Sequence, residues 1–226
     1  GAQRPFEPVQ LEPSLQPDEH GILRDVGWGQ GPRVSELLLI VPGAGWKTQL
    51  FSQSSWTPQR VERTADGKGW VLTGKAEWEQ GGVEVEERIM PETGRVTVAY
   101  RLRFAADTDC EGVRLIVRTP TEGMAGEGRL VQRIEKVAFT KPLPKDLPEA
   151  RHLAWMREPR WFAWERGGDM VIVKPQEGQV GEVMVQDCRE WQMNSFEAHL
   201  VAAGSQHVKA GQEVNLTVVL QPSTVA

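Results

Sequence analysis

Short stretches in which apolar and polar residues alternate, separated by turn residues, make up most of the chain. Between residues 95 and 104, Val96, Val98, Tyr100 and Leu102 occupy every second position, and Arg101 and Arg103 belong to the alternate set. A period of two is typical of a β-strand with one buried face. Similar runs predict strands at 35–41, 46–52, 59–64, 70–79, 82–90, 95–104, 113–118, 160–165, 169–174, 182–188, 196–202 and 213–221.

Turn residues separate these runs. Pro91-Glu92-Thr93-Gly94 and Arg166-Gly167-Gly168 predict tight hairpin turns, and residues 209–212 predict another. The single candidate for a helix covers residues 148–156. We therefore expect an all-β protein, a large antiparallel two-sheet β-sandwich of the supersandwich or jelly-roll kind.

The domain organisation follows from length and proline content. Four prolines lie within the first 17 residues, and proline fixes φ and removes a backbone donor. We expect residues 1–20 to form an extended segment and residues 21–226 to form a single β-sandwich domain, since all-β domains of this length are common.

Charge and hydropathy exclude two classes of partner. The net charge is −5 and no basic stripe is present, which argues against a nucleic-acid partner. The longest apolar run, residues 37–41, is the length of a strand, so no membrane-spanning helix is expected.

Two cysteines, Cys110 and Cys188, lie far apart in the sequence. Either they form one disulfide in an oxidising compartment, or both are small buried residues, and both alternatives stay open. The four histidines show no paired metal-ligand spacing, and surface or capping positions are expected for them.

Tryptophan is abundant: nine residues, against one tyrosine. A sandwich core needs few indoles, and a flat indole can stack on the apolar face of a sugar ring. In the last third of the chain, tryptophans and charged residues lie close in sequence, with Trp161 and Trp164 facing opposite sides of one strand. The predicted ligand-binding residues are Trp155, Trp161, Trp164, Trp191, Arg189 and Glu190.

Four glutamates share one face of the hairpin at 75–86: Glu77, Glu79, Glu84 and Glu86. Three interpretations are open: a solvated acidic face, a calcium site built from these carboxylates, or a catalytic pair. Hydrolysis of a glycosidic bond uses two carboxylates, and Glu77 and Glu79, two residues apart on one strand, are the candidates for it. Calcium is the only cofactor that the pattern suggests.

Three segments, residues 94–104, 111–120 and 181–191, resemble the large supersandwich β-domains found as accessory parts of bacterial carbohydrate-active proteins. The resemblance implies a sandwich fold, a polysaccharide context and a secreted or periplasmic location. It carries over no catalytic residue, because no family motif matches position by position.

Three functions are consistent with these observations. The favoured one is a polysaccharide- or oligosaccharide-binding module or accessory domain, without catalysis. The second is a glycoside hydrolase or polysaccharide lyase on the same scaffold, the hydrolase using a pair of carboxylates. The third is a structural or interaction domain without a glycan ligand.

Overall fold

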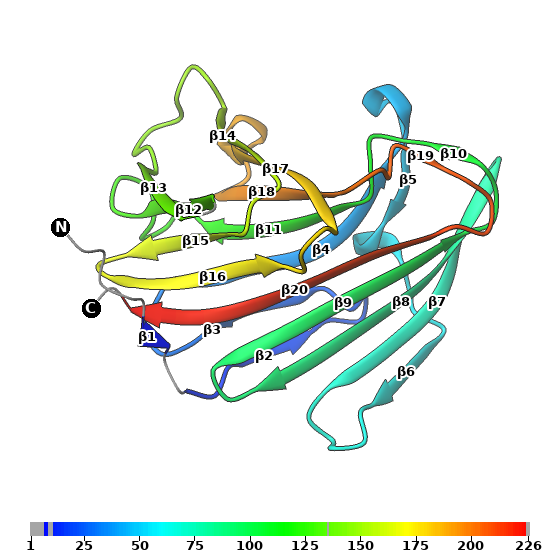
Figure 1. The fold of residues 1–226 in the computed structure, drawn as a ribbon, viewed down its shortest axis with the longest axis horizontal. Helices are drawn as coiled ribbons and strands as arrows, with labels where there is room; N and C mark the ends of the chain where they lie inside the picture. Colours follow the sequence, from blue (N-terminus) through cyan, green and yellow to red (C-terminus); the bar gives the residue numbers. More distant parts are fainter. Residues whose placement is uncertain (1–6, 9–10, 135, 225–226) are drawn as a thin grey trace.

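The computed structural model describes residues 7–8, 11–134 and 136–224, and this part of the chain forms two large antiparallel sheets packed face to face (Figure 1). The helical elements within it are three short 3-10 turns, η1 (Ala44–Trp46), η2 (Gln53–Ser55) and η3 (Cys188–Trp191). The predicted all-β antiparallel sandwich is confirmed.

The first sheet has ten strands among the described residues, in the order β13-β12-β15-β16-β20-β9-β8-β7-β6, with β1 paired to β20. Figure 1 shows β20, β9, β8 and β7 side by side. The strands are β1 (Glu7–Pro8), β6 (Arg60–Arg63), β7 (Trp70–Trp78), β8 (Gly81–Glu92), β9 (Arg95–Phe104), β12 (Arg129–Ile134), β13 (Val137–Pro142), β15 (Trp161–Arg166), β16 (Asp169–Pro175) and β20 (Glu213–Thr224).

The second sheet has eight strands among the described residues, in the order β14-β17-β18-β11-β4-β3-β2, with β5 paired to β4. The strands are β2 (Ser14–Pro17), β3 (Leu23–Gly27), β4 (Val34–Pro42), β5 (Gln49–Ser52), β11 (Arg114–Pro120), β14 (His152–Arg157), β17 (Val180–Asp187) and β18 (Ser195–Ala202). A separate pair joins β10 (Thr108–Asp109) to β19 (His207–Val208). Residues 14–17 of the proline-rich segment are thus a strand of the second sheet.

The hairpins follow the predicted turn chemistry. Glu92 pairs with Arg95 across Thr93-Gly94, and Arg166 pairs with Asp169 across Gly167-Gly168. The helix predicted at 148–156 is wrong. Residues 152–157 form strand β14, which pairs with β17, and a register shift between His152 and Ala154 breaks the alternation that would have indicated a strand.

The main core lies between the two sheets. Leu37, Leu39, Leu115 and Val117 of the eight-stranded sheet pack in one apolar cluster with residues of the ten-stranded sheet, including Trp164. Three of the nine tryptophans, Trp28, Trp56 and Trp164, are buried within it. These three tryptophans therefore pack in the hydrophobic core and are not available to stack on a ligand.

One polar cluster is enclosed in this core. Glu87, Tyr100 and Gln53 are all buried and contact one another. The amide oxygen of Gln53 accepts from the backbone N–H of Leu39 at 2.9 Å, and its nitrogen donates to the carbonyl of His20 at 3.1 Å. The cluster therefore ties the segment before β3 to both sheets.

The two cysteines are buried, free thiols in this structure. The Cys110 thiol donates to the carbonyl of Ser205 at 3.0 Å. Of the two alternatives that the sequence leaves open, the structure agrees with the second: Cys110 and Cys188 are small buried residues, and no disulfide joins them.

Candidate functional site

The outer face of the eight-stranded sheet, which points away from the ten-stranded sheet, carries one row of polar side chains and two rows in which polar residues lie among buried apolar ones such as Leu38, Ile40 and Ile116. Directly opposed residues in antiparallel strands share a face, so the strand register defines these rows. The first row contains Gln186, Glu197, Arg118, Glu36 and Arg24. The second contains Trp155, Met184, His199, Ile116 and Leu38, and the third contains Arg157, Glu182, Val201, Arg114 and Ile40.

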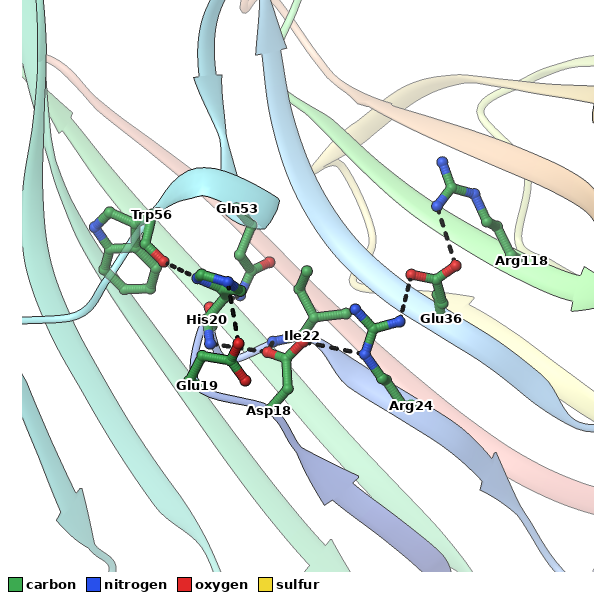
Figure 2. A network of polar contacts seen from close by, with 9 residues as sticks. All are labelled: Asp18, Glu19, His20, Ile22, Arg24, Glu36, Gln53, Trp56 and Arg118. Atoms are coloured by element: carbon green, nitrogen blue, oxygen red, sulfur yellow. Dashed lines mark hydrogen bonds and ion pairs between the residues drawn. The ribbon is translucent and has the colours of Figure 1, made fainter. Parts of the chain in front are cut away.

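Alternating charges connect the first row. Arg118 lies between Glu197 (2.9 Å) and Glu36 (3.3 Å), and Arg24 lies between Glu36 (2.8 Å) and Asp18 (3.1 Å). Figure 2 shows this network from Arg118 through Glu36 and Arg24 to Asp18, whose Oδ1 also accepts from the backbone of His20 and Ile22. Each carboxylate of this network therefore has a cationic partner, and we call the first row the ion-pair row.

Glu197 is the best-satisfied carboxylate of this face. It accepts from Arg118 Nε at 2.9 Å, from Gln186 Nε2 at 2.7 Å and from His199 Nε2 at 2.8 Å. Burial alone would raise the pKa of Glu197, but the hydrogen bonds and charges of His199, Arg118 and Gln186 outweigh it and lower the pKa to about 2. Glu197 is therefore an anion that holds its neighbours in place.

The tautomer of His199 follows from its two partners. Its Nδ1 lies 3.2 Å from Nη1 of Arg114, and a guanidinium has only donors, so Nδ1 accepts. The ring proton is then on Nε2, which donates to Glu197. His199 is buried, so the expectation of a surface or capping position is wrong for this histidine.

Trp46 projects from η1 beside these residues with 53% of its surface exposed. The Arg114 guanidinium lies 4.6 Å from the centre of its ring, and the His199 ring centroid is 6.5 Å away. Trp46 has φ +59°, which is rare for a bulky side chain. Because such conformations cost free energy and concentrate at functional sites, the loop is a candidate for a binding role. Glu111 holds the loop by accepting from the Gly45 N–H at 2.7 Å.

Trp155 is the second exposed indole of this face, with 60% of its surface exposed. It pairs with Met184, which pairs with His199, so it stands two strands, or roughly 10 Å, from His199. Trp46 and Trp155 thus lie on one face with His199 and Arg114. Exposed indoles beside fixed polar groups can stack on a ring and bond its hydroxyl groups.

The structure distributes the other predicted ligand-binding residues over different parts of the molecule. Trp161 lies on the outer face of the ten-stranded sheet beside Ala163 and Met170, and Trp164 is fully buried in the core. Trp191 is 48% exposed, with Arg151 at 5.5 Å from its ring centre. Arg189 bonds Asp187 at 2.7 Å, and Glu190 bonds Arg151 at 3.0 Å. Only Trp155 of the predicted set is on the face described above.

Sequence reasoning missed Trp46, Arg114 and His199. A usable signal was present: residues 114 and 118 in one strand, and 197 and 199 in another, are polar positions inside otherwise apolar runs. A charged residue at an alternate position of an apolar strand indicates a face that is not part of the core. The pairing of the two strands, which brings the residues together, is not readable from the pattern.

The acidic hairpin faces solvent on the ten-stranded sheet. Glu84 lies 4.0 Å from Lys75, and Glu86 bonds Arg88 at 2.6 Å and Arg101 at 3.0 Å. Glu77 and Glu79 are exposed, Glu79 in the turn itself. Among the described residues, no group of three or more His, Cys, Asp or Glu side chains could hold a metal ion. Calcium binding and a catalytic role of Glu77 and Glu79 stay predictions.

No protein-family model and no curated protein matches the sequence. Solved structures do match. A proposed aldose 1-epimerase from Escherichia coli K12 has a TM-score of 0.69 at 9% identity, over 97% of this chain and 100% of that one. A galactose mutarotase-like protein from Lactobacillus casei ATCC 334 has a TM-score of 0.61 at 10% identity, over 96% and 100%. A bacterial glucoamylase complexed with acarbose has a TM-score of 0.50 at 11% identity, over 98% of this chain and 34% of that one.

At these identities the likeness shows the fold. The fold is a β-sandwich like that of these epimerase- and mutarotase-named structures, so the sandwich fold that the resemblance implies is confirmed. Within the described residues, no helix is long and apolar enough to cross a membrane.

Proposed function

We propose that the protein binds a carbohydrate on the outer face of the eight-stranded sheet, where Trp46 and Trp155 stack on sugar rings and Arg114 bonds their hydroxyl oxygens. The observation that carries the proposal is Trp46, which is half exposed, held at positive φ, and positioned over Arg114 and beside His199. The sugar-related names of proteins with this fold add support. An oligosaccharide or polysaccharide is the ligand class proposed, because two exposed indoles are spread across the face.

Catalysis is the second candidate, and one specific observation favours it. His199 Nδ1 accepts from Arg114 and Nε2 donates to Glu197, so in this candidate function a substrate hydroxyl takes the place of Arg114 at Nδ1. A histidine fixed in one tautomer by a carboxylate is a recurring arrangement for general acid–base work. The corresponding reaction class is proton transfer at the anomeric centre of a free sugar, as the epimerase and mutarotase names of the neighbours suggest.

Binding is tested by isothermal titration with a panel of neutral and acidic mono- and oligosaccharides. Trp46→Ala and Trp155→Ala should each weaken binding by about 1–3 kcal/mol while the protein stays folded. Trp191→Ala is the matched control, because Trp191 is an equally exposed indole beside an arginine elsewhere on the surface. Loss of binding in Trp191→Ala with full binding in the other two variants would move the site to η3.

Catalysis is tested on the same sugars by polarimetry of freshly dissolved anomers. A rate above the uncatalysed one that His199→Gln abolishes would favour the enzyme over the binding module. Binding without any rate increase would leave the binding module as the function.

A location outside the cytoplasm is part of the proposal, since a polysaccharide-binding module meets its ligand there. Fractionation of the native source, followed by immunodetection of the chain, tests it. If the protein were recovered in the cytoplasmic fraction alone, the proposed location outside the cytoplasm would be wrong.

A further inference from the structure

Arg114 differs from Arg24 and Arg118, the two arginines of the ion-pair row on the same face. Arg24 and Arg118 each contact two carboxylates. Arg114 is half buried, and its bonds run from Nε to the carbonyl of Glu111 at 2.8 Å and from Nη1 to His199 Nδ1 at 3.2 Å. No carboxylate oxygen of the described residues lies within ion-pair distance of it.

Arg114 lies in the field of the carboxylates of Glu182 and Glu111 without ion-pair contact to either. Burial lowers the pKa of the guanidinium and outweighs the attraction of Glu182 and Glu111. An arginine stays protonated even so, and a partly desolvated cation without a paired anion costs free energy. An anion placed against Arg114 would recover part of that cost.

The position of the guanidinium limits what this anion can be. Trp46 lies on one side of it, 4.6 Å from the ring centre to Cζ, and Nη2 makes no hydrogen bond within the described residues. Because Nε already donates to Glu111 and Nη1 donates one of its two hydrogens to His199, a carboxylate would meet the remaining N–H groups of Nη1 and Nη2, which lie in one plane and match its two oxygens. Glu182 and Glu111 contribute negative charge nearby, which disfavours a second negative charge on the ligand.

We propose that the ligand of this face is an acidic sugar, a uronic acid or a chain containing one, whose carboxylate binds Arg114 while the sugar ring stacks on Trp46. The inference rests on the proposed function and specifies its ligand class. A neutral hexose leaves Arg114 without its anion, and a phosphate ester brings a double charge to a site with one unpaired cation.

Titration calorimetry with galacturonate and glucuronate, against galactose, glucose and glucose 6-phosphate, tests the ligand class. The uronates should bind at least about tenfold more tightly than the neutral sugars, because a charge-assisted bidentate pair is stronger than a neutral hydrogen bond. Arg114→Met should abolish this preference, and Arg114→Lys should keep only part of it. Arg103→Met, on the outer face of the ten-stranded sheet, removes one positive charge elsewhere and should change nothing.

A second titration uses the unmodified protein, so its result does not depend on whether a variant folds. The methyl ester of each uronate keeps the ring and removes the charge, so it should bind as weakly as the neutral hexose. Equal binding of acid and ester, abolished by Trp46→Ala, would overturn the acidic-sugar inference and leave the proposed function intact. Tighter binding of glucose 6-phosphate than of the uronates would also overturn it. Absence of binding by every sugar would remove the inference and the proposed function together.

Discussion

The hydroxyl oxygen of Tyr100 lies 2.6 Å from Oε2 of Glu87, and the second partner of this hydroxyl decides which of the two groups donates. The same hydroxyl lies 2.9 Å from the amide oxygen of Gln53, which carries no hydrogen and also accepts from the Leu39 N–H. The single phenolic proton must therefore point to Gln53. The 2.6 Å contact between Glu87 and Tyr100 is then a hydrogen bond only if Glu87 is a neutral acid that donates to the phenol oxygen. This agrees with the pKa of Glu87, which burial raises to about 8 although the hydrogen bonds of Tyr100 and Gln53 lower it in part.

The first prediction concerns stability against pH. The folded-state pKa of Glu87, about 8, is above its ordinary value of 4.5, so the folded protein binds the proton more tightly than the unfolded chain does. The stabilisation is complete below pH 4.5 and is lost as the pH rises toward 8. We expect the free energy of unfolding to fall by roughly 3 kcal/mol between pH 4.5 and pH 7 from this group.

Denaturant unfolding of Glu87→Gln isolates this contribution. The glutamine amide can donate to Tyr100 and accept from Gln53 without titrating, so the variant should equal the parent near pH 5 and exceed it at pH 8. Parallel stability curves for the two proteins across this range would show that Glu87 is ionised in the folded state.

The second prediction concerns Gly21. Its φ is +77°, and a Cβ there would lie 2.2 Å from Oε1 of Glu87. Gly21→Ala should cost about 2–4 kcal/mol, from overpacking and backbone strain together. Gly178→Ala is the matched control, because Gly178 has φ +80° with nothing within 4 Å of the added Cβ. Equal losses in the two variants would mean that only backbone strain matters.

The third prediction concerns Glu197. Its folded-state pKa of about 2 is below the ordinary value of 4.5, so its stabilisation is present above pH 4.5 and is lost as the pH falls toward 2. Glu197→Gln should destabilise the protein by roughly 3 kcal/mol at pH 7 and flatten the acid limb of the stability curve. Glu84→Gln, an exposed carboxylate near Lys75, should change stability by less than about 1 kcal/mol. If urea unfolding showed the same loss of stability for Glu197→Gln and Glu84→Gln, the prediction for Glu197 would be wrong.

The fourth prediction concerns the cysteines. Burial raises the pKa of both thiols, Cys110 and Cys188, which makes them poor nucleophiles. Thiol titration in denaturant without reductant should find two free thiols, and the folded protein should react far more slowly. A chain with no free thiol under denaturing conditions would show that the disulfide forms.

The strands were readable because their signal is local. Residues 95–104 alternate strictly, and the strand β9 covers the same residues. Residues 14–17 were missed because their alternation covers only four residues and ends at a proline, and residues 23–27 were missed because they do not alternate. Residues 152–157 were predicted as helix because a bulge interrupts the period of two.

The sequence by itself determined that this chain forms an antiparallel sandwich, because the period of two and the turn residues depend only on neighbours along the chain. Only the tertiary structure decided which indoles are exposed and which polar residues meet. Arg114 and His199 are 85 residues apart, and their contact exists because β11 pairs with β18 in one register. A shift of one residue between the two strands would place Arg114 and His199 on opposite faces of the sheet, and the alternation pattern does not specify which partner strand supplies the register.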